Sequence, residues 1–293
     1  MQRLKNSLRN ITIKLFKFIS KVLRSFKAEK LPFFPKTSQF VYHLLINNKV
    51  NMDGFDIYLD SNDSLGLSIF GRYEPLEIET IKKEIQEGSV FVDIGANIGY
   101  HTLHLARHVG EKGHIYAFEP DEENYALLEK NVQINGINNV TLIKKAVSNK
   151  VGTAKLYLSD INKADHQIYK TKEIRKAIVI ETTTLDDYFA SYSGSIDFIK
   201  MDIQGSEYLA FKGMRSILKK YPNIKMVMEY WPAAIKACGE DPKKFLDDLL
   251  SLGFSFYDVN DANKSVIPIN KAEIIAKYSL KPGIYTNLLC KRR

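Results

Sequence analysis

The run from Val90 to Gly99, Val-Phe-Val-Asp-Ile-Gly-Ala-Asn-Ile-Gly, restricts this chain more than any other segment. Its first five residues are typical of a buried strand, its glycines of a tight turn, and the residues from Tyr100 of a helix. Glycines let a ligand approach the backbone, and a helix N-terminus offers unpaired N–H groups to an anionic end. Glu119 follows the next strand-like run, 115–118, where a carboxylate can accept hydrogen bonds from both ribose hydroxyls. The segment therefore predicts a site for a ligand that carries a nucleoside.

Two ligand classes use such a turn, dinucleotides and S-adenosylmethionine. The dinucleotide fingerprint is G-x-G-x-x-G, whereas this turn reads Gly95-x-Asn97-x-Gly99 after Asp93 and lacks the third glycine. The leading acid would approach phosphates in a dinucleotide, but it suits the ammonium and sulfonium of S-adenosylmethionine. A turn without any ligand, in which Asp93 only caps the following helix, is the third interpretation. We infer S-adenosylmethionine as the cofactor.

Strands and helices alternate from residue 90 onward, which is the signature of a parallel sheet. We therefore expect an α/β fold with a doubly wound, mostly parallel, seven-stranded sheet. A helix is expected before it, over 74–87, and another follows the fourth strand, over 206–219. Strand-like stretches at 155–158 and 178–183 form an insertion. The expected strands of the sheet are 90–94, 115–118, 140–144, 196–201, 224–229, 254–259 and 285–290.

Five residues fall at or just after the ends of these strands: Asp93, Glu119, Ala146, Asp202 and Glu229. In a doubly wound sheet, ligands bind beyond the carboxyl ends of the strands, near the switch in strand order. One such residue at a strand end could arise by chance, but five on the same rim are harder to explain in that way. The rim is therefore the expected ligand site.

Positive charge is concentrated at the N-terminus, whereas the rest of the chain has balanced charge. Residues 1–30 hold nine basic residues and one acid, whereas the remainder balances at 33 basic and 33 acidic residues. The balance argues against a nucleic-acid groove on the catalytic domain. We expect a basic amphipathic helical tail over 1–30, a lead-in with a small hairpin and a helix over 31–88, and the ligand-binding domain over 89–293.

Apolar residues of the tail recur every three or four positions and so share one helical face, with lysines and arginines on the other. Three interpretations stay open: a helix lying on anionic lipid, a helix packed on its own domain or a partner, and a cleaved targeting peptide. The two cysteines, Cys238 and Cys290, form no disulfide framework and no metal-ligand cluster. A reducing, cytoplasmic setting is the default, with contact to the membrane surface through the tail as one option. No metal site is legible in the sequence, and a Mg²⁺ ion bound by carboxylates stays an open alternative.

The chain resembles the FkbM-type family of S-adenosylmethionine-dependent methyltransferases. The residues that carry the resemblance span about 70–230, and the first 50 and last 50 residues do not carry it. Two positions depart from the family pattern: Gln204, where Glu is more usual, and Gln167, where Arg is common. The matching stretches are 92–99, Ala117-Phe118-Glu119-Pro120 with Asn124, and 199–207, together with Tyr73-Glu74-Pro75 and 164–169.

The resemblance implies a Rossmann-like class I methyltransferase fold and a set of cofactor-binding residues. Glu119 is the expected ribose clamp, Asp93 the partner of the methionine ammonium, and Ala146 an adenine-facing backbone position. Asp202 would face the sulfonium or orient the acceptor. The full expected set is Glu74, Asp93, Gly95, Asn97, Gly99, Glu119, Ala146, Asp165, Asp202 and Glu207.

Methyl transfer to a hydroxyl needs a group that accepts its proton, and a histidine is a common choice. His101, in the first turn after Gly99, and His166, beside Asp165, are the candidate catalytic histidines, with Asp202 as the catalytic carboxylate. A structural role for either histidine is an equally good interpretation.

Three hypotheses of function follow. The leading one is O-methylation of a hydroxyl on a small molecule, sugar or glycan. The second is a non-catalytic S-adenosylmethionine-binding scaffold that docks through its basic tail. The third, a nicotinamide-dependent oxidoreductase, is disfavoured by the missing third glycine. The methyl acceptor and the oligomeric state are not encoded in any motif.

Overall fold

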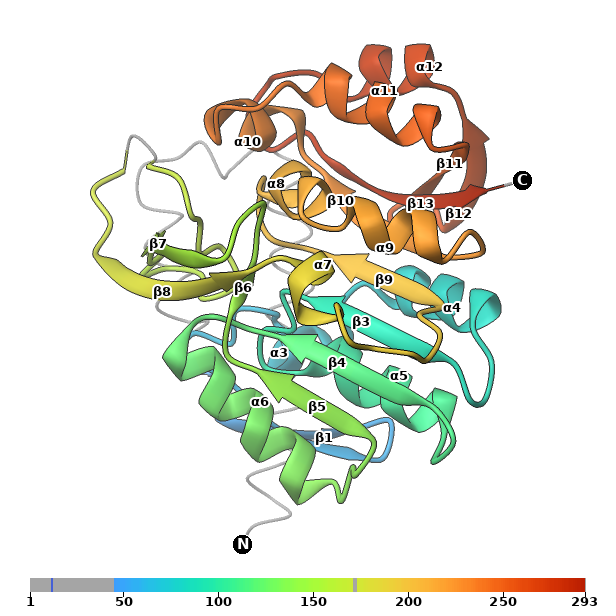
Figure 1. Ribbon diagram of the computed structural model, residues 1–293. Coiled ribbons are helices and arrows are strands. Elements are labelled where there is room, and N and C mark those ends of the chain that lie inside the picture. Colours follow the sequence, from blue (N-terminus) through green and yellow to red (C-terminus); the bar gives the residue numbers. More distant parts are fainter. Residues whose placement is uncertain (1–11, 13–44, 171–172, 293) are drawn as a thin grey trace, which may run out of the picture.

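The computed structural model describes residues 12, 45–170 and 173–292. The predicted tail helix, 1–30, lies outside these residues except for Thr12. The centre of the molecule is a twisted eight-stranded sheet of order β12-β11-β13-β10-β9-β3-β4-β5 (Figure 1). Its strands are β3 (Val90–Ile94), β4 (His114–Phe118), β5 (Val140–Ile143), β9 (Phe198–Met201), β10 (Lys225–Tyr230), β11 (Phe254–Asn260), β12 (Ser265–Ile269) and β13 (Thr286–Arg292).

Five neighbouring strands, from β10 to β5, are parallel, while β13, β11 and β12 pair antiparallel in succession. The prediction of seven strands misses one, β12 at the sheet edge. Its sequence, Ser-Val-Ile-Pro-Ile, contains Pro268 and buries none of its side chains fully. An edge strand tolerates a proline because one side of its backbone needs no partner, so no alternating pattern announces it.

Helices cover both faces of the sheet, which confirms the doubly wound α/β class. On one face lie α4 (Pro75–Glu84), α5 (Tyr100–Val109) and α6 (Glu122–Ile134), together with the hairpin of β1 (Lys49–Met52) and β2 (Phe55–Tyr58). On the other lie α8 (Glu207–Lys212), α9 (Arg215–Lys220) and α11 (Pro242–Ser251). Further helices are α3 (Leu67–Phe70), α7 (Leu185–Tyr188), α10 (Pro232–Ala237) and α12 (Lys271–Lys277).

The single helix expected over 206–219 is broken into α8 and α9 at Gly213. A Cβ atom at this glycine would lie 2.0 Å from the carbonyl oxygen of Ser148, so the backbone of the insertion passes directly over it. The backbone N–H of Asp186 donates to the Gly213 carbonyl at 3.0 Å. Tertiary contact therefore interrupts a segment whose local pattern favours one helix.

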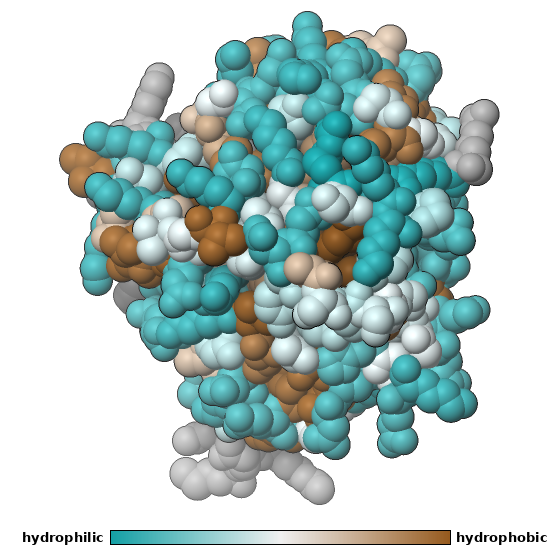
Figure 2. Space-filling view, viewed as in Figure 1, coloured by the Kyte–Doolittle hydropathy of each residue, from teal (hydrophilic) through white to brown (hydrophobic). Residues whose placement is uncertain are grey.

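The insertion after β5 forms a second sheet of order β6-β8-β7, made of β6 (Ala146–Val147), β7 (Gly152–Tyr157) and β8 (Ala177–Thr183). It stands beside the carboxyl ends of the parallel strands, on the left of Figure 1. In Figure 2 apolar patches interrupt the hydrophilic surface over this region, and exposed apolar side chains of the insertion include Val151, Ile161 and Val179. Among the described residues, no helix combines the length and apolarity needed to cross a bilayer.

Candidate functional site

The glycine turn after β3 is held by backbone contacts with two neighbouring strands. The N–H groups of Gly95 and Ala96 both donate to the Phe118 carbonyl at 3.0 Å, and Asp202 N–H donates to the Ile94 carbonyl at 3.1 Å. Gly95 has φ of +82°, and a Cβ there would lie 2.1 Å from the Asp202 carbonyl oxygen. Only glycine combines this conformation with so close an approach. The turn, the end of β4 and the end of β9 therefore form one rigid unit.

Glu119 is buried directly beneath this turn. Its Oε2 accepts the Asn97 N–H at 2.9 Å and its Oε1 accepts the Asp121 N–H at 3.0 Å. Asn97 has φ of +52°, a conformation that asparagine tolerates better than most residues. Burial raises the pKa of Glu119 to about 7, although the two backbone hydrogen bonds oppose the shift. Each carboxylate oxygen keeps a second lone pair that ribose hydroxyls can use.

A pocket opens over the turn, at the carboxyl ends of β3, β4 and β9. The structure brings seven of the predicted site residues to its wall: Gly95, Asn97, His101, Glu119, Ala146, His166 and Asp202. The residues fit S-adenosylmethionine. The buried Glu119 carboxylate can accept hydrogen bonds from a ribose, Gly95 permits a close backbone approach, and the Asp202 carboxylate can face a cationic group. Five predicted residues lie outside the wall: Glu74, Asp93, Gly99, Asp165 and Glu207.

Asp93 lies below the turn with no exposed surface. Its Oδ2 accepts the Thr102 hydroxyl at 2.6 Å, and its Oδ1 lies 3.7 Å from Lys200 Nζ. Burial alone would lower the pKa of Lys200, but the carboxylates of Asp93 and Asp202 raise it above its ordinary value. Asp93 therefore acts on a ligand only through the turn and through Lys200. Gly99 begins α5 with φ of +90° and packs against Leu128.

Asp202 is the predicted catalytic carboxylate, and its side chain is 24% exposed. Its Oδ1 accepts a hydrogen bond from Gln204 Nε2 at 2.8 Å, and its Oδ2 lies 3.9 Å from Lys200 Nζ. These two contacts orient the carboxylate without closing it off from the pocket. Gln204, the departure from the family pattern, thus serves as a donor to Asp202.

Glu207 is fully buried and holds the loop that follows Asp202. Its Oε1 accepts the N–H groups of Ile203 at 2.9 Å and Gly205 at 3.2 Å. Burial raises the pKa of Glu207 to about 7. Because its bonded oxygen points into its own loop, the structure gives Glu207 a positioning role toward Asp202, not a place on the pocket wall.

Three acids converge beside the pocket from distant segments. Glu74 precedes α4 and accepts a hydrogen bond from Asn287 Nδ2 at 3.3 Å. Glu77, one turn further along α4, and Glu229, near the end of β10, are both buried. Burial raises the pKa of all three, that of Glu74 to about 7, and the charge of Asp202 adds to each shift. Glu74 thus belongs to this group of acids and not to the pocket wall.

The two candidate histidines lie in different surroundings. His101, on α5, is buried with its Nε2 3.4 Å from Glu77 Oε1, and burial lowers its pKa well below the ordinary value. His166 accepts the Ser159 N–H through Nδ1 at 3.0 Å, and its Nε2 lies 3.9 Å from Asp121 Oδ1. Since Nδ1 accepts, Nε2 carries the ring proton of neutral His166. This leaves no free lone pair for a base and suits a structural anchor.

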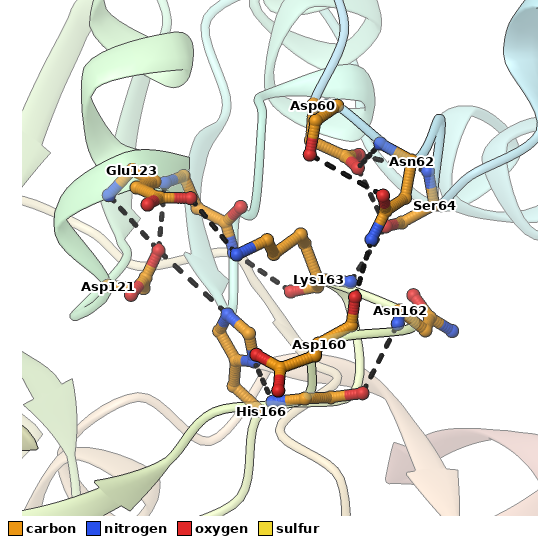
Figure 3. A network of polar contacts seen from close by, with 12 residues as sticks. Asp60, Asn62, Ser64, Asp121, Glu123, Asp160, Asn162, Lys163 and His166 are labelled. Atoms are coloured by element: carbon orange, nitrogen blue, oxygen red, sulfur yellow. Dashed lines mark hydrogen bonds and ion pairs between the residues drawn. The ribbon is translucent and has the colours of Figure 1, made fainter. Parts of the chain in front are cut away.

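That anchor belongs to a strap, residues 158–168, which crosses the pocket between β7 and β8. Figure 3 shows how the strap is tied down on two sides. Asn62 Nδ2 donates to the carbonyls of Asp160 and Ile161 at 2.8 and 3.2 Å. On the other side, Lys163 Nζ lies 3.1 Å from Glu123 Oε2 on α6. The strap thus links the segment after the hairpin to the start of α6.

The strap contributes Lys163, Ala164, His166 and Ile168 to the pocket wall. Asp165 points away from the pocket: its Oδ2 lies 2.7 Å from Arg175 Nη2, and its Oδ1 accepts from Gln167 Nε2 at 2.7 Å. Asp165 therefore braces the strap, and Gln167, the second departure from the family pattern, contacts it in place of a ligand.

Lys200 and Glu77 are site residues that the sequence analysis does not predict. Each is a charged residue within an otherwise apolar face, which is a sequence signal for a buried polar site. Lys200 interrupts the apolar strand Phe198–Met201, and Glu77 lies one turn before Ile81 on the apolar face of α4. A charged side chain on a buried face needs a buried partner, and here the partners are Asp93 for Lys200 and His101 for Glu77.

The sequence profile of the "Methyltransferase FkbM domain" matches residues 93–256. A "probable cobalt-precorrin-6B C(15)-methyltransferase (decarboxylating)" of Sulfurisphaera tokodaii is 38% identical over 63 residues, which are 22% of this chain and 33% of that protein. The chain thus matches about a third of the length of this curated relative.

Two solved structures are among those that this chain resembles. One is an rRNA methylase from Streptococcus thermophilus, with 12% identity, a TM-score of 0.42 and coverage of 74% of this chain and 95% of that one. The other is a SAM-dependent O-methyltransferase from Thermotoga maritima, with 13% identity, a TM-score of 0.42 and coverage of 83% and 77%. On the strength of the profile match, which spans more than half of its residues, this chain belongs to the FkbM family of S-adenosylmethionine-dependent methyltransferases.

Proposed function

We propose that this methyltransferase transfers its methyl group to a hydroxyl oxygen of a small molecule, a sugar or a glycan. The observation that carries the proposal is the position of Asp202. Its partly exposed carboxylate lies on the pocket wall next to the turn, oriented by Gln204 and near the buried ammonium of Lys200. An oxygen nucleophile requires such an acceptor for its proton.

S-adenosylmethionine supplies a methyl group on a sulfonium, from which a neutral thioether departs. In the proposed reaction the acceptor oxygen forms the new C–O bond with its lone pair, while the C–S bond breaks and its electrons stay on sulfur. Asp202 takes the hydroxyl proton and passes it to water. Glu119 would hold the ribose, the 95–99 turn would face the methionine end, and Ala146 would lie on the adenine side. Alignment of the oxygen with the methyl group supplies much of the rate.

Aromatic side chains on the same rim support a hydroxyl-rich acceptor. Trp231 directly follows β10 and Tyr285 directly precedes β13, and their ring centroids lie 6.1 Å apart. Burial and the charges of Glu229, Glu74 and Asp202 raise the pKa of Tyr285, so this aromatic pair and the acids share one region. Aromatic faces pack against the apolar side of a sugar ring, and carboxylates accept hydrogen bonds from its hydroxyls.

The test incubates the full-length protein and labelled S-adenosylmethionine with methyl glycosides, glycolipids, RNA and a protein mixture. We expect label in a sugar or glycan hydroxyl, found as a base-stable ether by mass spectrometry. Asp202→Asn should lower turnover by about 10²–10⁴-fold while calorimetry still detects donor binding. The matched control, Asp248→Asn, changes an acid whose pairs with Lys244 and Arg215 lie away from the pocket.

Label in RNA or protein would contradict the acceptor class. Donor binding without transfer to any acceptor would favour the non-catalytic scaffold instead. Unchanged turnover of Asp202→Asn would remove Asp202 from the proton path, in which case His101 is the next candidate to test.

The basic tail, 1–30, fits a lipid-linked acceptor in this proposal, with the protein on the cytoplasmic side of a membrane. Nine basic residues against one acid favour an anionic surface. The full-length protein should sediment together with phosphatidylglycerol vesicles. A variant that lacks residues 1–30 should stay in the supernatant. A full-length protein that ignores these vesicles would rule out the lipid contact and leave the methyl-transfer proposal unaffected.

A further inference from the structure

Three potential metal ligands meet beside the pocket from two packed helices. Glu74 and Glu77 lie one turn apart at the start of α4, and His101 lies in the first turn of α5. One ligand atom from each residue lies within 4.8 Å of the other two. Within the set, His101 Nε2 lies 3.4 Å from Glu77 Oε1.

Two of these atoms lack a hydrogen-bond partner although they are buried. Glu77 is 3% exposed and His101 6% exposed, and neither Glu77 Oε1 nor His101 Nε2 makes a hydrogen bond among the described residues. An unsatisfied buried polar group destabilises a fold by about 1–3 kcal/mol, and more when it is charged. Two such atoms facing each other indicate that a third group completes them.

The carboxyl groups around the two atoms also suit a cation. Glu74, Glu77, Asp202 and Glu229 influence one another electrostatically, and Lys200 is the ammonium that compensates them. Lys200 already lies near Asp93 and Asp202. An imidazole with two carboxylates is a donor set for divalent metals.

We propose that Glu74, Glu77 and His101 bind a divalent first-row transition-metal ion at the acceptor side of the pocket. Mixed imidazole and carboxylate ligands suit Mn²⁺, Fe²⁺, Co²⁺ and Zn²⁺, whereas Mg²⁺ prefers oxygen ligands alone. With metal–ligand bonds of about 2.0–2.2 Å, ligand atoms lie roughly 3–4 Å apart. The His101–Glu77 pair already meets this spacing, and the Glu74 ligand atom lies within 4.8 Å of both.

The site would act on the methyl acceptor, a role that rests on the proposed function. His101 lies on the wall of the same pocket as Asp202 and the glycine turn. A divalent cation there would attract the acceptor oxygen and lower the pKa of its hydroxyl, so that Asp202 receives the proton more readily.

A proton shared between Glu77 and His101 is the competing explanation of the close pair. It requires neither Glu74 nor a metal, so the two explanations differ in a measurable way. The test uses full-length protein treated with EDTA and dialysed, then titrated with Mn²⁺ by calorimetry and by the loss of the free-ion electron paramagnetic resonance signal.

We expect one Mn²⁺ per chain for the wild type. Glu77→Gln and His101→Gln should each weaken binding by at least about a hundredfold, more than loss of an outer-shell partner does. The matched control is His104→Gln, because His104 lies one turn along α5 with its Nε2 also 3.4 Å from a carboxylate, that of Asp53. His104 is not one of the three proposed ligands, so His104→Gln should bind Mn²⁺ with wild-type affinity. Thermal melts verify that each variant is folded.

Pulsed electron paramagnetic resonance of Mn²⁺ bound to the wild-type protein needs no variant. A histidine ligand appears there as a coupling between the manganese electron spin and a ¹⁴N nucleus. Absence of Mn²⁺ binding, absence of that coupling, or equal affinity in all variants would overturn the site. If Mn²⁺ binds as expected but metal-free protein methylates a hydroxyl at the same rate, the catalytic role fails and the site stands. If no hydroxyl is methylated under any condition, the proposed function fails, and the Mn²⁺ titration still decides the site.

Discussion

Asp93 and Lys200 occupy paired positions on the adjacent strands β3 and β9, and Asp93 Oδ1 lies 3.7 Å from Lys200 Nζ in the interior. Both side chains are almost fully buried. The ammonium also lies 3.9 Å from Asp202 Oδ2. One buried cation therefore connects the acid beneath the glycine turn to the acid that faces the pocket.

Lys200→Met tests this connection. Loss of one partner leaves buried carboxylates uncompensated, which lowers the free energy of unfolding by about 3–5 kcal/mol. Urea unfolding followed by circular dichroism measures the change. The control, Lys225→Met, removes a lysine at the start of β10 whose pair with Glu84 is partly exposed, and it should change stability by about 1 kcal/mol or less. Equal effects of the two substitutions would show that the Lys200 contacts are not special.

Glu119 gives donor binding a pH dependence. Ribose hydroxyls donate to the ionised carboxylate, and its pKa is raised to about 7 by burial. Below pH 7 the apparent Kd for S-adenosylmethionine should therefore rise by up to about tenfold per pH unit, and above pH 8 it should level off. Isothermal calorimetry across pH 5.5–9 measures this. Glu119→Gln should weaken binding by about 10–100-fold at pH 8 and flatten the profile. A profile that keeps its slope in Glu119→Gln would assign the titration to another group.

The same group also affects stability without ligand, and the sign follows from its shift. A carboxyl whose folded pKa lies above its ordinary value of 4.5 holds its proton more tightly in the native state than in the unfolded chain. Its contribution therefore favours the folded state at low pH and declines as the pH rises from about 4.5 to 7. Glu119→Gln should remove this share of the decline, as urea unfolding at a series of pH values can show.

Local patterns predict the sheet because buried parallel strands read as short apolar runs between helices. The strand ends follow from the same patterns, and the sequence alone therefore places Glu119 and Asp202 on one rim of the sheet. The break at Gly213 and the edge strand β12 could not be placed, since the first depends on the carbonyl of Ser148 and the second on its pairing with β11.

The acids beside the pocket show a second limit of prediction from the sequence. Glu74 and Glu77 come from the segment before the glycine turn, and they reach His101 and Asn287 only because α4 packs against α5 and the antiparallel part of the sheet. No spacing within the chain encodes that contact. His166 illustrates the converse: its neighbour in sequence, Asp165, turns to Arg175, while its own ring faces Ser159 and Asp121.

Gly95→Ala tests the fit of the turn. A methyl group there would lie 2.1 Å from the Asp202 carbonyl oxygen at a φ of +82°. Gly136→Ala is the matched control, since Gly136 has φ of +62° but nothing within 4 Å of the added carbon. The control should lose about 1–2 kcal/mol from conformation alone, and Gly95→Ala about 1–3 kcal/mol more from overpacking. Calorimetry should also show weaker donor binding for Gly95→Ala only. Equal melting points and affinities would mean that β9 can shift to accommodate the methyl group.

The strap should control how fast the donor leaves. Asn62 Nδ2 donates to two strap carbonyls, those of Asp160 and Ile161, and the strap supplies four residues of the pocket wall. Asn62→Ala removes both bonds, which together stabilise the closed strap by about 1–2 kcal/mol. Stopped-flow measurement should then show S-adenosylmethionine dissociating about 5–30-fold faster, and amide exchange should increase over residues 158–168. Asn138→Ala, an exposed asparagine between α6 and β5, should change neither. Faster exchange with an unchanged dissociation rate would show that the strap can loosen without releasing the donor, and the pocket would then retain its ligand through Glu119 and the glycine turn.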